Sequence, residues 1–389
     1  MRLIFSGALA LGLTAAGTAQ ANIDIPVTYL RAEQVAPPVL SNLDPDPDDL
    51  GIAGARTALA DNLTTGQFMG HRYALDVVSV EPDGDVLSTA RAALAASPFL
   101  ILDAPADTLL AIADLPEAAG ALIFNSTAPD VTLRDADCRA NVLHTIASTA
   151  MRTDALMQVL MQKRWTDIVA IVGTHPDDLA YEAALDRSAT KFGLEIRARE
   201  TWAFDADMRR SAATEVPLFT QGFGDYDVLV VADEIGDFGE YILYNTWEPR
   251  PVAGSVGMSP RTWSPVLEQW AAVQLQNRFE DMQGRSMRDE DYGAWTALRS
   301  IGEAVTRTNS ADPATLRAFL LSDDFRLDGF KGRALSFRHW NGQLRQPVPV
   351  VHPRALVTLA PVEGFLHRVT ELDTLGVDEP ETACTAFAD

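Results

Sequence analysis

The chain has 389 residues and a formal net charge of −23. This strong negative charge argues against nucleic acid and anionic membrane surfaces as partners. A chain of this length exceeds one hydrophobic core of ordinary size, so we expect two domains.

The first 21 residues have the order typical of a secretory signal peptide. One cation, Arg2, precedes an apolar run from Leu3 to Leu13, and a small-residue ending, Ala19-Gln20-Ala21, follows. The apolar run is too short to span a bilayer, and no later stretch stays apolar for about 18 residues. We therefore expect export to the periplasm, cleavage after Ala21 and no membrane insertion.

Short β-rich runs alternate with amphipathic helical runs along most of the chain, which predicts parallel sheets with helices on both faces. Two successive series share this layout, so we expect an α/β protein of two doubly wound lobes, joined by a hinge of several crossovers. The strands of the two series are expected at 23–30, 73–80, 98–102, 120–124, 168–172, 194–201 and 228–232. Their helices are expected at 51–63, 86–96, 108–115, 149–164, 179–192, 206–219 and 238–244.

The last third of the chain has a different order of elements. The helix expected at 313–321 has a clear start signal in Asp312-Pro313. A turn is expected at Asn341-Gly342, between two of the last strands. The further helices are expected at 265–283 and 289–308, and the further strands at 251–256, 334–338, 343–351 and 355–360.

The chain has two cysteines, Cys138 and Cys384. In an oxidising compartment an even count favours a disulfide, so we expect these residues to be paired. Two buried free thiols are the alternative. There is no Cys-x-x-Cys motif, which argues against redox catalysis.

The motifs of common enzyme classes are absent from the sequence. There is no G-x-S-x-G, no G-x-x-x-x-G-K-[ST] and no H-E-x-x-H. The six histidines are scattered, and no two have the spacing that would place them on one helix face. We therefore expect a protein that is not an enzyme and that needs no cofactor and no bound metal.

Four loops that follow expected strands carry polar residues, and ligands bind at the carboxyl ends of strands in such sheets. For a single loop, helix N-capping is the better explanation. Four such loops in two facing lobes favour a ligand site. Hydroxyls and the N–H groups at helix starts would bind an anion. Carboxylates would bind an ammonium group or ligand hydroxyls. The candidates are Asp103 and Ala104, then Asn125, Ser126 and Thr127, then the loop 173–178, and then Asp233 and Glu234.

Two aromatic residues, Trp263 and Tyr292, are further candidates for the ligand site. Aromatic side chains usually complete clefts of this kind. Packing in the core is the alternative for both, and it is the preferred interpretation for Trp295, because Trp295, Leu298 and Ile301 have helical spacing.

An acidic stretch with four aspartates in six positions precedes the first expected helix. Its alternate-residue spacing resembles a calcium loop, but prolines stiffen it and the glycine and glutamate of such a loop are missing. At the end of the first strand, it would lie at the mouth of the ligand site, with Asp48 or Asp49 as the cap of the helix. We expect Asp44 or Asp46 to contact the ligand, and a calcium or lanthanide site in this loop is an alternative.

Four stretches resemble the leucine/isoleucine/valine-binding branch of ABC-transporter substrate-binding proteins, which have the type I periplasmic binding protein fold. They are the N-terminal strand, GIAGARTALADN at 51–62, FNSTAPDVTLRDADCRANVLHT at 124–145 and MRDEDYGAWTALRSIGEAVTRT at 287–308. The stretches at 40–71 and 134–145, and a tail with a lone cysteine, also resemble a subgroup associated with PQQ-dependent alcohol dehydrogenase systems.

The resemblance implies a monomeric, hinged binder that closes on a small-molecule ligand and presents it to an ABC permease. A periplasmic sensor or accessory protein on the same fold is the alternative. The implied divisions are the signal peptide at 1–21, lobe 1 at 22–145 and 255–345, lobe 2 at 146–254 and 346–375, and a tail at 376–389.

The ligand loops of the family's first lobe fall on 103–104 and 125–127 of this chain, and Thr127 agrees with the family pattern. Asp103 departs from it, because a carboxylate there would repel the carboxylate of an amino acid. Leu179 and Glu234 stand where the branch often has tyrosines. These departures argue against branched-chain amino acids, and the subgroup implies a ligand of alcohol metabolism instead.

Overall fold

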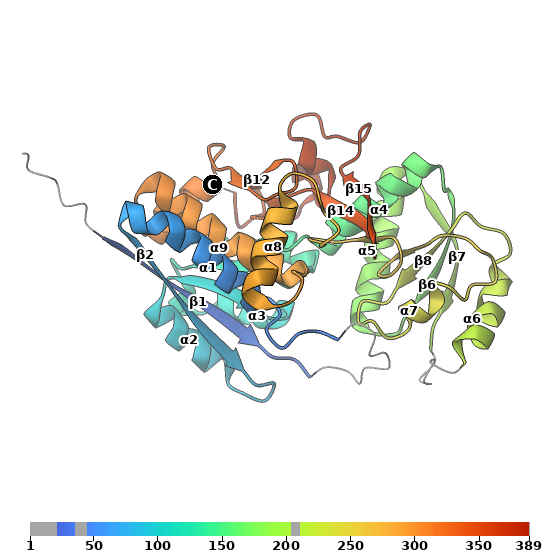
Figure 1. Ribbon diagram of the computed structural model, residues 1–389, viewed down its shortest axis with the longest axis horizontal. Helices are drawn as coiled ribbons and strands as arrows, with labels where there is room; N and C mark the ends of the chain where they lie inside the picture. The colour runs from blue at the N-terminus through green and yellow to red at the C-terminus, as the bar shows by residue number, and fades with distance from the viewer. Residues whose placement is uncertain (1–21, 36–44, 204–210, 389) are drawn as a thin grey trace, which may run out of the picture.

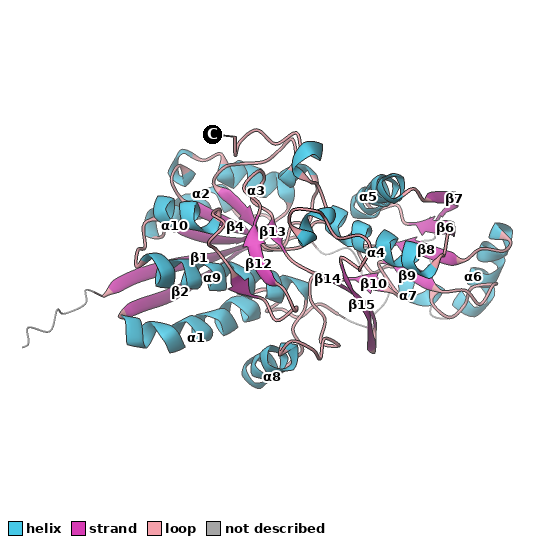
Figure 2. Ribbon diagram, turned by 90° about the horizontal axis from the view of Figure 1, so that it is seen from above, coloured by secondary structure: helices cyan, strands magenta, loops and turns pink. Residues whose placement is uncertain are grey.

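The computed structural model describes residues 22–35, 45–203 and 211–388. Its two parallel sheets, one of five strands and one of four, lie in two separate parts of the molecule (Figures 1 and 2). We call the part around the five-stranded sheet lobe 1 and the part around the four-stranded sheet lobe 2. This arrangement confirms the expected fold class of two doubly wound α/β lobes.

Lobe 1 has the strand order β2-β1-β3-β4-β5. Side chains alternate between the two faces of a strand, so Ile25, Val27 and Tyr29 of β1 pack on one face, and Leu30 packs on the other. Helices α1 and α9 cover the first face and α2 and α3 cover the second. The bounds are β1 Ile23–Ala32, α1 Ile52–Met69, β2 His71–Val80, α2 Val86–Ala96, β3 Phe99–Asp103, α3 Ala106–Ala113, β4 Leu122–Asn125, β5 Val142–His144 and α9 Asp289–Thr308.

Lobe 2 has the strand order β7-β6-β8-β9. Helices α4 and α5 pack on one face of this sheet, and α6 and α7 pack on the other. The expected helix at 206–219 is described only from residue 211 onward, where α6 lies. The bounds are α4 Thr149–Lys163, β6 Asp167–Val172, α5 Pro176–Phe192, β7 Glu195–Thr201, α6 Ala212–Thr220, β8 Val228–Ala232, α7 Gly239–Ile242 and β9 Val252–Gly254.

Two small antiparallel sheets come from the last third of the chain. The strand expected at 343–351 is in fact two strands, because β13 pairs with β12 in lobe 1 and β14 pairs with β10 and β15 beside α4. Pro347 separates them, and it lacks the N–H that a continuous strand would need. The bounds are β10 Ser259–Pro260, β11 Leu327–Asp328, β12 Ala334–Phe337, β13 Leu344–Arg345, β14 Val348–His352 and β15 Ala355–Ala360.

The helices near the C-terminus agree with the sequence except at one start. Helix α8 begins at Ala272 and not at the expected residue 265, because Trp270 and Ala271 have the left-handed φ angles of 54° and 62°. Within the described residues, no helix combines the length and the apolar character needed to cross a membrane. The remaining helices are α8 Ala272–Gln283, α10 Pro313–Leu320, and the short η1 Pro116–Ala118, η2 Thr132–Arg134, η3 Gln221–Phe223, η4 Glu371–Thr374 and η5 Glu379–Glu381.

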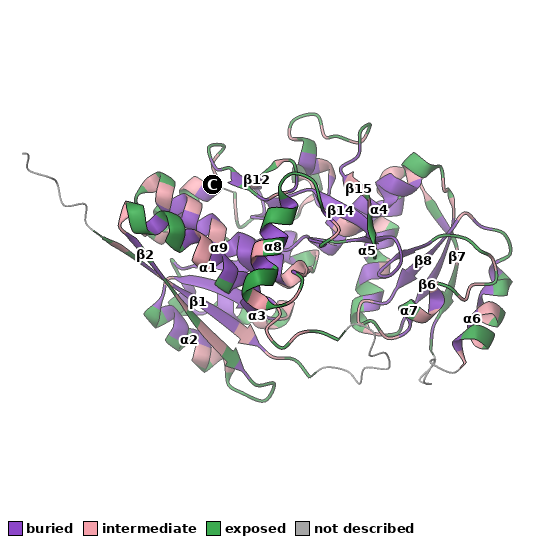
Figure 3. Ribbon diagram, viewed as in Figure 1, coloured by how far each residue is buried: buried purple, intermediate pink, exposed green. Residues whose placement is uncertain are grey.

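The chain crosses between the lobes several times, and each lobe keeps its own buried core (Figure 3). It leaves lobe 1 after β5, returns after β10 and leaves again after β13. Near the C-terminus, Cys384 forms a disulfide with Cys138, with an S–S distance of 2.05 Å, which confirms the expected pairing.

Candidate functional site

Each sheet has a point where the strand order reverses, and ligand crevices in open α/β sheets lie at such points, beyond the carboxyl ends of the strands. In lobe 1 this point is between β1 and β3, and in lobe 2 it is between β6 and β8. Helices α3 and α7 follow the carboxyl ends of β3 and β8, and both lie in the lower half of Figure 1.

A pocket of about 240 Å³ lies at the reversal point of lobe 2. The loops that follow β6, β7 and β8 line it, so three strand ends contribute to one hollow. One wall is aromatic, because Trp202 and Phe238 stack with their ring centroids 5.3 Å apart. The other wall is polar and includes Thr174, His175 and Asp178.

Asp178 joins two of these loops. Its carboxylate accepts hydrogen bonds from the backbone N–H of His175 at 3.1 Å and of Glu234 at 2.7 Å. Burial raises the pKa of Asp178 to about 6, although these hydrogen bonds act in the opposite direction. A buried carboxylate with a raised pKa in a pocket is a common feature of ligand sites.

The sequence predicts the loop 173–178 as part of a ligand site, but it does not predict the aromatic wall of this pocket. Trp202 directly follows β7, and a tryptophan at a strand end is a signal that could have been used. Phe238 was assigned to a helix, and only the tertiary structure brings it against Trp202.

Glu234 is held by an arginine of the helix that enters lobe 2. Arg152 of α4 donates two hydrogen bonds to its carboxylate, at 2.7 and 2.8 Å, and the Ser255 hydroxyl donates a third at 2.7 Å. Burial opposes ionisation of Glu234, but Arg152 outweighs this effect, so the pKa of Glu234 is below its usual value. The charge of Glu234 is therefore balanced within the protein.

Asp233 is buried and shapes its own loop. Its carboxylate accepts hydrogen bonds from the backbone N–H groups of Asp237, Phe238 and Gly239, at 2.8, 2.9 and 2.6 Å. These contacts hold the start of α7 and place Phe238 in the pocket wall. They match the helix-capping interpretation of this residue.

Asp103 is also paired, at the reversal point of lobe 1. Its carboxylate accepts hydrogen bonds from the Tyr29 hydroxyl at 2.9 Å and from Arg31 Nε at 2.8 Å. Arg31 further donates to the backbone carbonyls of Asp48 and Leu50. Arg31 from β1 supplies the charge opposite to Asp103, which weakens the expected repulsion of an anionic ligand.

The neighbouring candidates of lobe 1 differ in exposure. Ala104, Asn125 and Ser126 are buried, whereas Thr127 is partly exposed. The Asn125 side chain accepts hydrogen bonds from the backbone of its own loop, and its amide also lies 3.0 Å from His144 Nδ1. Of the candidates in this loop, Thr127 is therefore the one that is accessible to solvent.

Trp263 and Tyr292 lie in the core of lobe 1, away from the pocket at the strand ends of lobe 2. Their rings stack with centroids 4.8 Å apart, and they are 2% and 0% exposed. The Tyr292 hydroxyl donates to the carbonyl of Gly329 at 2.7 Å. The expectation that these rings complete a ligand cleft is corrected to the core alternative, which also holds for Trp295.

The acidic stretch before α1 is bound to the loop between α8 and α9. Asp44 lies outside the described residues. Asp46 forms an ion pair with Arg288 at 3.0 Å, and Asp49 forms one with Arg285 at 2.8 Å. In the described part of the chain, no group of three or more histidine, cysteine, aspartate or glutamate side chains is arranged to hold a metal ion.

The cap of α1 comes from another helix. The backbone N–H of Gly51 donates to Asp291 Oδ1 of α9 at 2.8 Å, and neither Asp48 nor Asp49 caps α1 with its side chain. The expectation that Asp48 or Asp49 caps this helix is therefore wrong. The first turns of α1 and α9 are instead joined, and Arg285 holds Asp291 in place at 2.7 Å.

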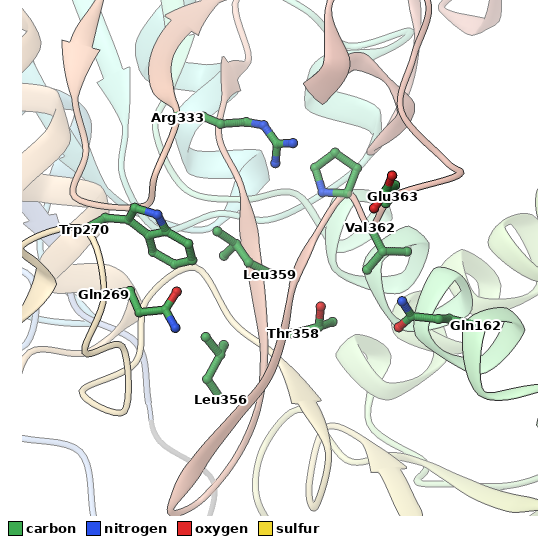
Figure 4. Close-up of a pocket in the computed structure, with 10 residues that line it drawn as sticks. Gln162, Gln269, Trp270, Arg333, Leu356, Thr358, Leu359, Val362 and Glu363 are labelled. Carbon is green, nitrogen blue, oxygen red and sulfur yellow. The ribbon is translucent and has the colours of Figure 1, made fainter.

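A second, more open pocket of about 430 Å³ lies beside β15 (Figure 4). Leu356 and Thr358 of β15, Gln162 of α4, Trp270 and Arg333 line it. Its lining comes from α4, β15 and loops of the last third of the chain, and not from the loops that follow the parallel strands. The pocket of lobe 2 is therefore the candidate ligand site.

No known protein-family profile and no curated protein matches this sequence. Many solved structures resemble its fold. A branched-chain amino acid ABC transporter periplasmic ligand-binding protein from Burkholderia xenovorans is 15% identical, with a TM-score of 0.71, and the match covers 93% of this chain and 100% of that protein.

Two further structures contain ligands. An ABC transporter substrate-binding protein from Desulfitobacterium hafniense in complex with Leu is 15% identical, covers 87% of this chain and 99% of its own, and has a TM-score of 0.61. A solute-binding protein from R. palustris in complex with benzoate is 12% identical, covers 94% and 100%, and has a TM-score of 0.63. The chain therefore has the two-lobed fold of the periplasmic binding proteins.

Proposed function

We propose that the protein is the periplasmic solute-binding component of an ABC transporter and is not an enzyme. The observation that carries this proposal is the pocket at the β6/β8 reversal point, where strand ends of lobe 2 form a hollow of about 240 Å³. The similar structures support it, because they are described as ABC transporter binding proteins and two of them hold a small molecule.

In this proposal, a small ligand first binds one lobe and the two lobes then close on it. Ligand contacts with both lobes exist only in the closed form, so ligand shifts the hinge equilibrium toward closure. We propose lobe limits at 22–145 with 255–345 and at 146–254 with 346–375. The partner of the closed form is an ABC permease, and the protein acts as a monomer.

The pocket favours a ligand with an apolar body and a few polar groups. Trp202 and Phe238 offer a flat apolar wall, and the Thr174 hydroxyl and the loop N–H groups offer hydrogen bonds. Because Arg31 and Arg152 already balance Asp103 and Glu234, the ligand needs no positive charge to neutralise them. We propose an alcohol or its aldehyde or acid oxidation product, linked to PQQ-dependent alcohol oxidation.

Native mass spectrometry of freshly purified protein tests this proposal first, because a ligand that co-purifies would be seen directly. X-ray scattering with a panel of alcohols, aldehydes, aliphatic and aromatic acids, amino acids and pyrroloquinoline quinone then tests closure. We expect one class to reduce the radius of gyration. If no compound in the panel compacts or binds the protein, the proposal fails.

A variant pair locates the site. Thr174 is exposed on the pocket rim, so Thr174→Arg should fill the pocket without disturbing the fold and should abolish binding of the compound found. Thr65→Arg places the same change on an exposed position of α1 and should bind as the wild type does. Equal binding by both variants would move the site away from the lobe 2 pocket.

The calcium or lanthanide alternative has less support from the structure. Arg288 and Arg285 already occupy the carboxylates of Asp46 and Asp49, so a cation would have to displace two arginines. Calorimetric titration with calcium and with a trivalent lanthanide should therefore show no saturable binding, and a saturable isotherm would favour the metal alternative.

A further inference from the structure

The C-terminal segment of the chain touches both lobes after the last strand. Leu375 packs in the core that α4 and α5 share with the lobe 2 sheet. Twelve positions later, Phe387 packs against the core of lobe 1. The chain therefore crosses once more between the lobes, and we call residues 375–388 the C-terminal strap.

Both lobes touch the start of the strap, since Arg338 of lobe 1 donates to the carbonyls of Leu375 and Val377 at 2.6 and 3.1 Å. Lobe 2 holds the strap between them through a buried aspartate and two cations. The backbone N–H of Gly376 donates to Asp154 Oδ2 of α4 at 2.7 Å, and Arg187 and Lys191 of α5 both donate to the Gly376 carbonyl at 2.9 Å. The same two cations reach Glu381, at 2.7 and 3.6 Å. Arg187 and Lys191 are only partly exposed and Asp154 is buried, so the ion pairs with Asp154 are less screened by solvent than surface pairs.

Lobe 1 holds the other end of the strap covalently. Cys384 is joined to Cys138, which lies in the loop between η2 and β5. Next to the disulfide, the Thr382 hydroxyl donates to the carbonyl of Arg134 at 3.1 Å. The ring of Phe387 then packs against lobe 1, where Arg317 lies over it with its Cζ 5.3 Å from the ring centroid.

The strap is short, and it lies on the side of the molecule away from the strand ends. A chain from Gly376 to Cys384 spans at most about 28 Å when fully extended, and η5 folds part of it more tightly. In Figure 1, the dark red C-terminal segment runs along the upper edge, whereas α3 and α7 lie in the lower half. If the lobes rotate so that α3 and α7 in the lower half of Figure 1 approach each other, the upper parts of the lobes move apart. This rotation would stretch the strap.

We propose that the C-terminal strap is a restraint on hinge closure, anchored to lobe 1 by the Cys138–Cys384 disulfide and to lobe 2 by Glu381 and Gly376. In the absence of ligand, it holds the lobes apart and limits their approach. The proposal concerns only the rotation of the two lobes, so it stands whether or not a permease receives the ligand.

Distance measurements on the ligand-free full chain test the restraint. Spin labels are attached through non-natural amino acids, which leave the disulfide intact, at the exposed positions Asp107 on α3 and Leu218 on α6. Glu381→Gln weakens the lobe 2 anchor, and the pair Cys138→Ser with Cys384→Ser removes the covalent part of the lobe 1 anchor. Both should broaden the distance distribution and shift it to shorter distances by more than about 2 Å, the scale of a hinge rearrangement.

Glu379→Gln is the matched control. It makes the same chemical change in the same short helix, but Glu379 is exposed and faces His339 of lobe 1, 3.5 Å away. Its distribution should equal that of the wild type. An unchanged distribution in the two strap variants, or a shift to longer distances in either, would overturn the proposal.

A loss of folding in the serine pair does not decide the question, because Glu381→Gln keeps the disulfide and gives the answer alone. The wild-type chain, treated with a reductant under native conditions, provides a second version of the released lobe 1 anchor. It should show the same shift to shorter distances, and an unchanged distribution after complete reduction counts against the restraint.

Discussion

At the scale of single residues, the pairing of Arg152 with Glu234 should dominate the stability of the pocket loops. Both side chains are largely withdrawn from solvent, with 12% and 16% exposure, and the contact is bidentate. Arg152→Met leaves the carboxylate of Glu234 without its partner, so we expect a loss of about 3 kcal/mol in the free energy of unfolding.

Urea unfolding of three proteins checks this prediction. The double variant Arg152→Met with Glu234→Leu removes both charges and should recover most of the loss. Arg250→Met breaks an ion pair with the exposed Asp225 and should change the stability little. A similar loss in Arg152→Met and Arg250→Met would contradict the special role of the buried pair.

A second prediction at this scale concerns pH. Burial raises the pKa of Asp178 to about 6, compared with about 3.8 for the unfolded chain, so the folded state binds more protons between these values. The contribution of Asp178 to stability therefore falls as the pH rises from about 4 to about 6. The Asp178→Asn variant lacks this dependence. Its free energy of unfolding should therefore rise relative to that of the wild type as the pH increases over that interval.

Urea midpoints measured at several pH values from 4 to about 7 provide the test. Asp107→Asn is the control, because Asp107 is exposed in the first turn of α3. Its midpoints should run parallel to those of the wild type. The prediction is wrong if the difference between Asp178→Asn and wild type is constant across the interval.

At the scale of the elements, the close packing of α1 on α9 depends on glycine. A Cβ atom on Gly54 would lie 1.9 Å from the backbone carbonyl oxygen of Asp291, which is a rigid group. Gly54→Ala must therefore push the two helices apart, and we expect it to destabilise the protein by about 3 kcal/mol, at the upper end for overpacked positions. Thermal or urea unfolding measures the change.

Gly222→Ala is the matched control for this prediction. Gly222 has a negative φ angle, and a Cβ atom there would meet nothing within 4 Å. The variant should therefore be at least as stable as the wild type, since alanine also loses less backbone entropy on folding. Equal destabilisation by both alanines would show that contact with Asp291 is not the cause.

The elements also show which local sequence signals predict the bounds of helices and strands correctly. Helix α9 has the bounds expected from the sequence, because acidic residues in its first turn and Asn309 after its last residue mark both ends. Strand β5 was missed, because three residues give no periodic pattern. The expected strand at 343–351 was divided between two sheets, since its pattern does not record that the chain changes lobes at Pro347.

At the scale of the whole molecule, the disulfide should contribute substantially to stability. It joins residues 246 positions apart, and closing such a loop removes unfolded-state entropy worth at most about 5 kcal/mol. The pair Cys138→Ser with Cys384→Ser should therefore lower the free energy of unfolding by about 2 to 5 kcal/mol.

Urea unfolding with and without reductant measures this loss in two ways. The reductant should lower the midpoint of the wild type and leave that of the serine pair unchanged. If the reduced wild type unfolds at the same midpoint as the oxidised form, the cross-link does not limit the unfolded chain, and the prediction fails.

The sequence by itself determined the class of fold and favoured the disulfide over two free thiols. Hydrophobic periodicity is a local property, so it located most strands and helices and showed two similar series of them. The pairing of Cys138 with Cys384 followed from their number and the expected compartment. These conclusions did not require knowledge of which distant residues meet.

Only the tertiary structure decided the chemistry of the site. Asp103 looked like a free carboxylate until Arg31 of a neighbouring strand was seen against it, and Trp263 and Tyr292 proved to be core residues. The pocket wall of Trp202 and Phe238 joins two loops that are far apart in the chain. Burial and ion pairing depend on contacts between distant segments, and the order of residues along the chain does not contain them.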